Sequence, residues 1–411
     1  MIKSDLISEE FYILKRKVKA LCYSLLFYGC RIFPIERKKI VLWSFEGTQG
    51  FCCNPKYIAE ELLKRNLNNN RSWKLVWLVD DEKQVFPKGI KKIKNTTWNR
   101  VFQLSTAGCW IGNSRTFYGT KKRKKQLYIQ TWHGTIAIKP IGKYRGKLFP
   151  RMAYLVSKTD SKLTDYVLSG STWCDTHYRK GLVYDGTIIR TGTPRCDILV
   201  DEDKKNKIKE QIKKKYKVAE GVNILLYAPT FRGGSQSTKR TIAKEEIKLD
   251  FERILDCMEK RFGGKWILFT RLHPQLAAKN EDFCMGKRLE GWIDVTHHPD
   301  MNELIAAADG FISDYSSAIF EAALLEIPCF IFADDLEDYV QNRGDLFFYM
   351  YKLPFPVALK NDELIKNIEC FDFEIYVKEV RKFMNEQGVV ELGDASKKVV
   401  DLIEREKHFG K

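Results

Sequence analysis

Short apolar segments alternate with helix-like segments along most of the chain, in two successive halves. In the first half, the apolar runs at residues 40–45, 74–79 and 127–130 have the length of buried strands. A helix-like segment at residues 55–64 separates the first two of them. Such alternation is typical of a parallel sheet that carries helices on both faces.

The second half of the chain repeats this pattern. Its strand-like runs lie at residues 222–227, 265–270, 293–295, 310–313 and 329–332, and its helix-like segments at residues 204–217, 251–262, 300–308 and 318–325. A chain of 411 residues is too long for one hydrophobic core. We therefore predict an α/β fold with two Rossmann-like, doubly wound domains that face a cleft, preceded by an N-terminal amphipathic helical segment.

This prediction divides the chain into four parts. They are a membrane-associating helical segment, an N-terminal Rossmann-like domain, a C-terminal Rossmann-like domain and a final group of helices. The predicted boundaries are residues 1–37, 38–190, 191–375 and 376–411. The hinge between the two domains is expected near Gly192-Thr193-Pro194.

The N-terminal segment has an unusual pattern of charge. Basic residues stand on both sides of an apolar run at residues 20–29, which is too short to span a bilayer. An apolar helix face with basic flanks is typical of a helix that lies in the interface of an anionic membrane. The alternative is a helix that packs on the body of the protein. The polar, acidic start does not resemble a cleavable signal peptide, so we expect a peripheral protein on the cytoplasmic face of the cell membrane.

The composition indicates which partners to expect. A net charge of +17 and a pI near 9.2 favour an acidic partner, such as a phosphorylated substrate or an anionic membrane surface. The basic runs lack interleaved aromatic residues, so we expect no nucleic acid. The eleven cysteines are scattered without a CxxC pair, which favours buried thiols in a reducing cytoplasm over a zinc site. No carboxylate cluster has metal-ligand spacing, so we expect no cofactor, with a helper magnesium ion as the open alternative.

Paired hydroxyl groups mark the point where one predicted strand becomes a helix. Ser316 and Ser317 follow the strand at residues 310–313 and precede the helix at residues 318–325. The free N–H groups of a first helical turn, the helix dipole and the two hydroxyls together favour an anion. The alternative is that a serine only caps the helix, with Glu321 completing the helix start.

Polar clusters follow three other predicted strands in the same way. The carboxyl ends of parallel strands lie at one edge of a sheet, where ligands of such folds bind. Arginine offers a planar fork to phosphate oxygens, and histidine donates or accepts a proton near neutral pH. We therefore expect a phosphate-rich cleft formed by these clusters, which are His133-Gly134-Thr135, Pro229-Thr230-Phe231-Arg232 and Arg271-Leu272-His273-Pro274.

Two histidines in these clusters are the candidate catalytic residues. His133 belongs to the first half and His273 to the second, so a cleft between the domains brings them face to face. Trp132 supports His133, and Gly134 lets a ligand approach the backbone closely. The pair His297-His298 lacks such a setting, and we interpret it as a loop.

The ordered set of motifs resembles one family, the CDP-glycerol glycerophosphotransferases, which include the teichoic-acid primases and polymerases. The resemblance covers about residues 38–355. Each motif alone is weak, whereas the set in this order is specific. The motifs are Asn54-Pro55-Lys56-Tyr57, Gln130-Thr131-Trp132-His133-Gly134-Thr135, Gly192-Thr193-Pro194-Arg195-Cys196-Asp197, Tyr227-Ala228-Pro229-Thr230-Phe231-Arg232, Arg271-Leu272-His273, Ser313-Asp314-Tyr315-Ser316-Ser317, residues 335–339 and Arg343-Gly344.

The resemblance implies the two-domain GT-B arrangement and a reaction. Glycerol phosphate passes from CDP-glycerol to a hydroxyl of a lipid-linked, polyanionic acceptor, and CMP leaves. His133 is then the candidate general base on the acceptor side, and His273 acts on the donor side. With Arg232 of the strand-end cluster, the substrate-binding residues are Trp132, Gly134, Thr135, Ile136, Arg195, Pro229, Thr230, Arg271, Leu272, Ser316, Ser317 and Glu321.

Three departures from the family pattern leave the exact substrates open. Residues 136–139 read Ile-Ala-Ile-Lys where the family usually has Pro-Leu-Lys, Cys196 replaces an Asn, and Glu321 replaces an Asp. A CDP-ribitol transferase and a nucleotide-sugar glycosyltransferase of the same fold are the alternatives. The sequence also leaves open whether the enzyme is a primase or a polymerase, and whether its product is a teichoic acid or a capsule polymer. The basic residues at 121–125 and 139–147 are candidate contacts for a polyanion, with a solvated loop as the alternative for the first run.

Overall fold

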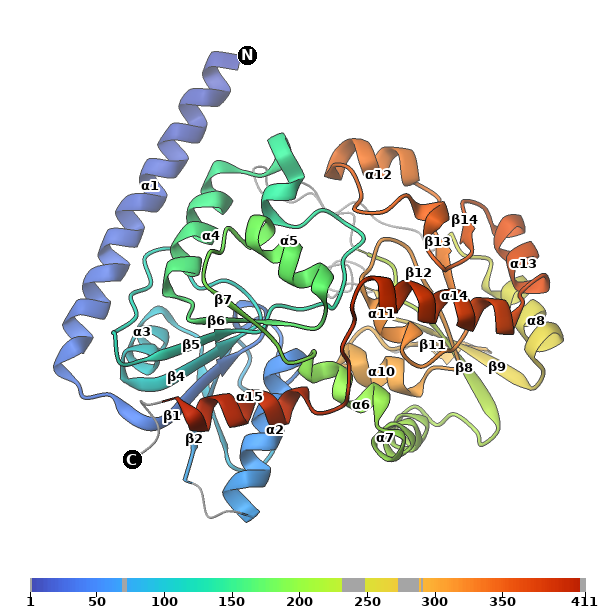
Figure 1. Ribbon diagram of the computed structural model, residues 1–411, viewed down its shortest axis with the longest axis horizontal. Helices are drawn as coiled ribbons and strands as arrows, with labels where there is room; N and C mark the ends of the chain where they lie inside the picture. Colours follow the sequence, from blue (N-terminus) through green and yellow to red (C-terminus); the bar gives the residue numbers. More distant parts are fainter. Residues whose placement is uncertain (1, 69–71, 231–247, 273–287, 290, 407–411) are drawn as a thin grey trace.

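The computed structural model describes residues 2–68, 72–230, 248–272, 288–289 and 291–406. Within these ranges the strands form two seven-stranded sheets, which lie side by side in Figure 1. Helices cover the faces of both sheets. The predicted α/β architecture of two Rossmann-like domains is confirmed.

The first sheet has the strand order β3-β2-β1-β4-β5-β6-β7, and its neighbouring strands pair in parallel. Its strands are β1 (Glu36–Trp43), β2 (Lys74–Val79), β3 (Ile90–Lys94), β4 (Ala107–Gly112), β5 (Leu127–Gln130), β6 (Tyr166–Ser169) and β7 (Thr187–Arg190). The helices of this half are α1 (Ile2–Gly29), α2 (Cys53–Asn68), α3 (Thr97–Thr106), α4 (Arg151–Leu163) and α5 (Thr172–Leu182).

The second sheet has the order β10-β11-β9-β8-β12-β13-β14, with β10 alone antiparallel among the described pairs. Its strands are β8 (Val222–Tyr227), β9 (Lys265–Thr270), β10 (Arg288–Leu289), β11 (Trp292–Asp294), β12 (Gly310–Ser313), β13 (Cys329–Phe332) and β14 (Val357–Ala358). The helices are α6 (Asp197–Val200), α7 (Glu202–Lys215), α8 (Phe251–Phe262), α10 (Met301–Ala307), α11 (Ala318–Ala323), α12 (Leu336–Arg343), α13 (Asn361–Glu369), α14 (Phe373–Glu386) and α15 (Ala395–Arg405).

The central strands are mainly apolar and buried because helices cover both faces of each sheet. Ile224, Leu225 and Leu226 of β8 are fully buried, as are Phe311 and Ile312 of β12. Burial of one such side chain stabilises the fold by roughly 1.5–3 kcal/mol. The two sheets therefore form the rigid supports on which the loops at their carboxyl ends are held.

The last helix returns to the first domain (Figure 1). On α15, Val399, Val400 and Ile403 are fully buried in the core that α2 also lines. Arg65 of α2 pairs with Asp401 at 2.7 Å, which adds a charged contact to this packing. The C-terminal helix thus ties the chain end back across the hinge.

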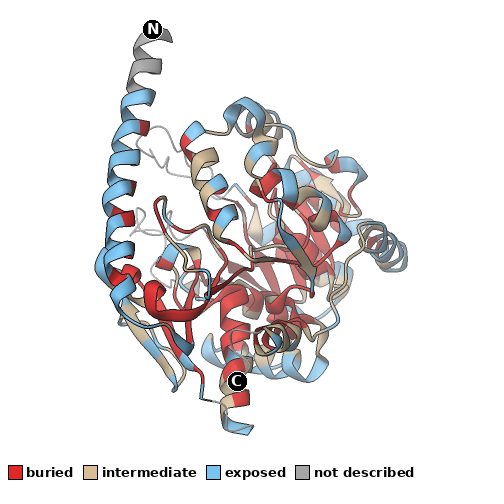
Figure 2. Ribbon diagram, turned by 60° about the vertical axis from the view of Figure 1, so that its left-hand side comes forward, coloured by how far each residue is buried: buried red, intermediate tan, exposed pale blue. Residues whose placement is uncertain are grey.

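Helix α1 has two different faces. Tyr23 and Phe27, with Cys30 just after the helix, are buried against the first domain, which agrees with the packed-helix alternative for this face. The opposite side shows exposed residues along its length (Figure 2). Among the described residues, none of the helices combines the length and the apolar composition needed to cross a membrane.

Part of the basic run at residues 121–125 has a structural role. Arg123 donates hydrogen bonds to the carbonyl oxygens of Arg31 and Phe33, at 2.6 and 2.8 Å, just after the end of α1. Lys122 pairs with the carboxylate of Asp165. Arg123 therefore attaches the end of α1 to the domain, and both cations already hold partners in the protein.

Candidate active site

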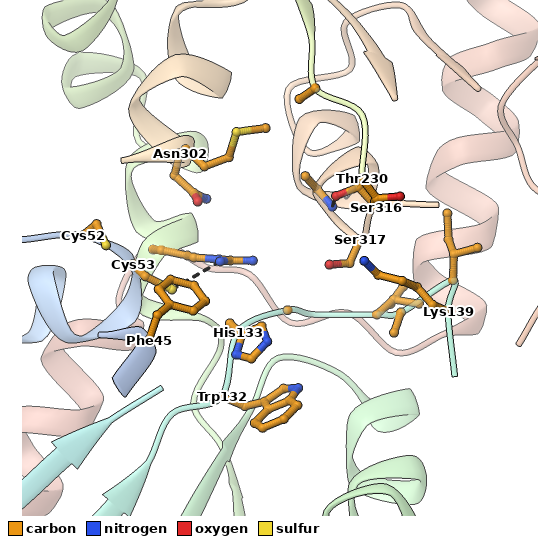
Figure 3. A pocket seen from close by; sticks show the side chains of 18 of the residues that line it. Phe45, Cys52, Cys53, Trp132, His133, Lys139, Thr230, Asn302, Ser316 and Ser317 are labelled. Carbon is orange, nitrogen blue, oxygen red and sulfur yellow. Dashed lines mark hydrogen bonds between the residues drawn. The ribbon is translucent and has the colours of Figure 1, made fainter. Parts of the chain in front are cut away.

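A cavity of about 480 Å³ opens between the two domains at the carboxyl ends of the sheets (Figure 3). The loops that follow β1, β5, β8, β9 and β12 all reach it. His133 and Trp132 lie on one side, and Thr230, Ser316 and Ser317 lie on the other. The predicted residues that line it are Trp132, His133, Gly134, Ile136, Arg195, Pro229, Thr230, Arg271, Leu272, Ser316 and Ser317.

The ring of His133 is oriented by the main chain. Its Nδ1 lies 2.8 Å from the carbonyl oxygen of Asn113, so Nδ1 carries the proton and donates it there. Trp132 stacks on the ring with 4.4 Å between the centroids, and Phe45 lies at 5.4 Å. The lone pair of Nε2 is then left for a ligand.

Burial changes the acidity of this histidine. Desolvation lowers the pKa of His133 from its ordinary 6.5 to about 4, and the cations Arg195, Lys139 and Arg115 act in the same direction. The hydrogen bond to Asn113 opposes this shift only in part. His133 is therefore neutral near pH 7, which is the form that can accept a proton.

The backbone of the His133 loop is unusual. Trp132 has a φ of +49° and Gly134 a φ of +150°, a region that residues with a side chain rarely adopt. A Cβ added at Gly134 would lie 3.5 Å from Oγ of Ser317, in the other domain. The positive φ, rather than a lack of space, is therefore what favours glycine at this position, and the two walls lie close together here.

Ser316 and Ser317 follow β12 as predicted, and they differ from each other. Oγ of Ser316 accepts a hydrogen bond from the N–H of Ala318 at 3.3 Å, which is a capping contact. Ser317 is the N-cap residue of α11, but among the described residues its side chain makes no capping bond. The capping alternative thus applies to Ser316, whereas the Ser317 hydroxyl lines the cavity beside Gly134.

Thr230 is fixed from below by a buried carboxylate. Asp314 accepts hydrogen bonds from the main-chain N–H of Thr230 at 2.9 Å and from its hydroxyl at 3.1 Å. Asp314 is 1% exposed. The loop after β8 is therefore joined to the loop after β12, and Thr230 and the two serines form one wall.

Two arginines bring positive charge into the cavity. Arg271 donates to the carbonyl oxygen of His298 at 3.2 Å, and desolvation lowers the pKa of its guanidinium. Arg195 forms an ion pair with Glu321 and donates to Sγ of Cys53 at 3.3 Å. Both cations lose hydration in this setting. The charge of Arg195 is already paired with the buried carboxylate of Glu321, so Arg271 is the better placed of the two to stabilise an anion in the cavity.

Thr135 and Glu321, predicted to bind substrate, stand outside the cavity lining. Oγ of Thr135 lies 3.0 Å from that of Thr193 at the hinge. Glu321 is 1% exposed, and its oxygens accept from Arg195 and, at 2.8 Å, from Asn302. Burial explains both positions, because a buried polar group must find protein partners.

Arg232 and His273 lie outside the described residues, so the predicted opposition of His133 and His273 stays a prediction.

Several lining residues were missed by the sequence analysis. Phe45 and Cys52 come from the loop after β1, Cys53 is the first residue of α2, and Asn302 comes from α10. The signal for the first group was present in the motif Asn54-Pro55-Lys56-Tyr57, directly after the cysteine pair. His298, interpreted as a loop residue without a special setting, is buried and lies 2.8 Å from Glu303.

In the part of the chain that the structure describes, no three His, Cys, Asp or Glu side chains group together as metal ligands. The positive charges that reach the cavity belong to the side chains of Arg195, Arg271 and Lys139. The arrangement thus offers a neutral imidazole on one wall, and hydroxyls with a guanidinium on the other.

Comparisons with known proteins agree with this geometry. The chain is 28% identical to the teichoic acid poly(glycerol phosphate) polymerase of Bacillus spizizenii over 390 residues, 92% of this chain and 95% of that protein. It is 28% identical to the poly(ribitol-phosphate) polymerase of the same species over 393 residues, 94% of this chain. The chain spans only 60% of the length of that second protein, and 51% and 53% of two further poly(glycerol phosphate) polymerases that it matches.

A solved structure and a family model extend the comparison. The structure of the wall teichoic acid polymerase TagF superimposes with a TM-score of 0.78 at 26% identity, and covers 98% of this chain and 97% of that one. The family model described as CDP-glycerol:poly(glycerophosphate) glycerophosphotransferase matches residues 26–405. These matches confirm the family resemblance and the GT-B arrangement. The chain belongs to the CDP-glycerol:poly(glycerophosphate) glycerophosphotransferase family.

Proposed function

We propose that the chain transfers glycerol phosphate from CDP-glycerol to a hydroxyl of a lipid-linked glycan or poly(glycerol phosphate) acceptor and releases CMP. The product belongs to teichoic-acid or capsule-type polymers. The observation that carries this proposal is the neutral, oriented His133 directly across the cavity from Ser317 and Thr230. Membership of the family supports the choice of donor.

The first wall supplies the base. The acceptor hydroxyl loses its proton to Nε2 of His133 while its oxygen attacks the phosphorus that carries glycerol. A base whose pKa lies below the working pH is already unprotonated, and Nδ1 donates to Asn113, which stabilises the imidazolium that forms. A general base is usually oriented by a second group, and here the carbonyl oxygen of Asn113 orients His133.

The second wall receives the donor. As the new bond to phosphorus forms, the bond to the bridging oxygen breaks, and its electrons leave with CMP. Arg271, Ser317 and Thr230 face the space in which the pyrophosphate charge must sit. Hydrogen-bonding groups of the protein that are held in fixed positions stabilise such developing charge without having to reorganise. We propose no bound cofactor, and adding a chelator or magnesium to the assay tests whether a metal ion assists.

The main alternative is a different donor with the same chemistry. Ribitol-phosphate polymerases match the chain at an identity similar to that of the glycerol-phosphate polymerases, so CDP-ribitol is the second candidate. The test supplies CDP-glycerol, CDP-ribitol or UDP-sugars, each labelled in the nucleotide, together with a lipid-linked acceptor. We expect CMP release from CDP-glycerol, with product length read by mass spectrometry. Release of UDP, or of no nucleotide from any CDP-alditol, would reject the proposal.

We also propose that α1 holds the enzyme on an anionic membrane, where a lipid-linked acceptor is found. Phe11, Leu14, Val18, Leu21 and Leu25 are 56% to 70% exposed and fall on one side of the helix at spacings of three and four. Basic side chains flank this apolar stripe. Such a helix binds an anionic interface by apolar burial and by charge.

The double substitution Leu21→Glu/Leu25→Glu tests the membrane contact. We expect it to lower binding to phosphatidylglycerol vesicles by at least about tenfold, because each buried leucine contributes roughly 1.5–3 kcal/mol. Leu67→Glu is the matched control, since Leu67 is 85% exposed on α2. Vesicle binding that stays unchanged in the double variant would reject this role of α1.

A further inference from the structure

Asn54 on α2 uses both ends of its side-chain amide. Nδ2 donates to the carbonyl oxygens of Thr131 at 3.3 Å and Trp132 at 3.0 Å. Oδ1 accepts the main-chain N–H of Arg195 at 3.0 Å. The residue is 1% exposed, so water does not compete for these bonds.

The two backbone segments that Asn54 joins carry two functional groups of the cavity, the imidazole of His133 and the guanidinium of Arg195. The carbonyl of Trp132 belongs to the peptide bond that begins His133. Arg195 lies where the chain passes from the first domain to the second, and its guanidinium lines the cavity. One amide group therefore fixes the His133 loop relative to this arginine.

The bond to Trp132 matters because this loop is strained. A φ of +49° at a tryptophan is a left-handed conformation that persists only where the surroundings hold it. Asparagine suits the task because its amide donates and accepts at once. An aspartate of the same shape accepts only, and would set its oxygens against the two carbonyls.

The helix turn that carries Asn54 is itself attached to the second domain. The N–H of Cys53 donates to Asp300 at 3.3 Å, and Lys56 lies 3.4 Å from the same carboxylate. Lys56 also forms an ion pair with Glu303 of α10. Asn54 thus stands on a support that both domains hold.

We infer that Asn54 is a positioning residue, which sets His133 at its working distance from the second wall and from Arg195. The inference rests on the proposed function, because it assumes that His133 is the base. Asn54 does not itself line the cavity. Its substitution should therefore affect the rate of transfer more than the binding of the donor.

The kinetic test compares Asn54→Asp and Asn54→Ala with the unmodified chain. We expect kcat to fall by roughly 100-fold in both, since a displacement near 1 Å of a reacting group costs that much. The KM for CDP-glycerol should change by less than about threefold, because the second wall remains in place. The aspartate variant preserves the volume of the side chain. It therefore distinguishes the effect of losing the N–H hydrogen-bond donor from the effect of leaving a cavity.

Asn66 provides a matched control on the same helix. Its Nδ2 donates to the carbonyl of Trp73 at 3.0 Å, and its Oδ1 accepts from the N–H of Trp73 at 2.9 Å. Asn66→Ala therefore removes an equivalent bridge far from the cavity. We expect it to lower thermal stability and leave kcat unchanged. An equal loss of kcat in both alanine variants would overturn the inference.

A second measurement does not depend on turnover. NMR titration of His133 should move its apparent pKa from about 4 toward 6.5 in Asn54→Ala, because a released loop regains water while Arg115, Lys139 and Arg195 stay in place. A His133 titration that does not move in this variant would overturn the inference. If the unmodified chain turns over no CDP-alditol, the proposed function fails, and this titration alone decides the positioning role.

Discussion

The two walls of the cavity are built in different ways. On the first wall, Phe45, Cys53 and Trp132 all have positive φ although each has a side chain. Among the described lining residues of the second wall, none has a positive φ. There, hydroxyls and a guanidinium follow ordinary strand ends. The difference indicates that the first wall holds one neutral imidazole in place at the cost of backbone strain. The second wall presents hydroxyls and a guanidinium, which suit an anion, with little strain.

Removing the imidazole should produce the largest effect. We expect His133→Ala to lower kcat by about 10²–10⁴-fold, the usual contribution of a general base, with binding of CDP-glycerol within a few-fold of normal. Turnover and calorimetric binding of the donor, measured on the same preparations, check this.

His177 is the control for this prediction. Its Nδ1 lies 2.8 Å from the carbonyl oxygen of Trp173, and its ring stacks on Trp173 at 4.2 Å, as His133 stacks on Trp132. His177 does not line the cavity. His177→Ala should keep its turnover. If His133→Ala also keeps most of its turnover, the assignment of the base is wrong.

Weakening the second wall should give the next largest effect, of a different kind. We expect Arg271→Ala to lower kcat/KM by roughly 100-fold and, unlike His133→Ala, to weaken donor binding as well. Arg261→Ala is the control, because Arg261 likewise donates to a main-chain carbonyl, that of Phe371, outside the cavity. Donor binding unaltered in Arg271→Ala would show that the two walls do not divide the work in this way.

The smallest effect concerns stability against acid, and it belongs to the first wall. Folding lowers the pKa of His133 from 6.5 to about 4, so the unfolded chain binds a proton that the folded protein excludes. This contribution is fully present above pH 6.5 and is lost as the pH falls toward 4. The part of this contribution that is lost by pH 5 amounts to about 2 kcal/mol.

Urea unfolding near pH 7.5 and near pH 5 measures this contribution. We expect the unmodified chain to lose more stability between these two conditions than His133→Gln, which has no such proton to exclude. Equal losses in both proteins would mean that the imidazole is not desolvated, and the contrast between the walls would disappear.

The sequence predicted the buried strands well and the edge strands poorly. The runs at residues 222–227, 265–270 and 310–313 coincide with β8, β9 and β12 because central strands must be apolar on both faces. The edge strands β3 and β7 were missed because their residues are half-exposed or exposed, so the apolar run that marks a buried strand is absent. The interior strand β6 was missed as well, since its buried run is only three residues long.

The site divides in the same way. His133, Thr230, Arg271 and Ser317 could be predicted because each directly follows a strand whose end lies at the cleft. The partner of Glu321 could not be predicted, since Arg195 is 126 residues away along the chain. Nor could the role of the Asn54 amide, which bonds to residues that only folding brings beside it.

The sequence by itself determined the class of fold, the edge at which ligands bind and the family, because strand periodicity and the order of motifs are written along the chain. The tertiary structure alone decided which of those polar groups face the cavity and which form hydrogen bonds or ion pairs that support its walls. Glu321 and Thr135 became supports, and Phe45 and Cys53 became lining. The physical reason is that buried polar groups must be satisfied, and their partners come from segments distant in sequence.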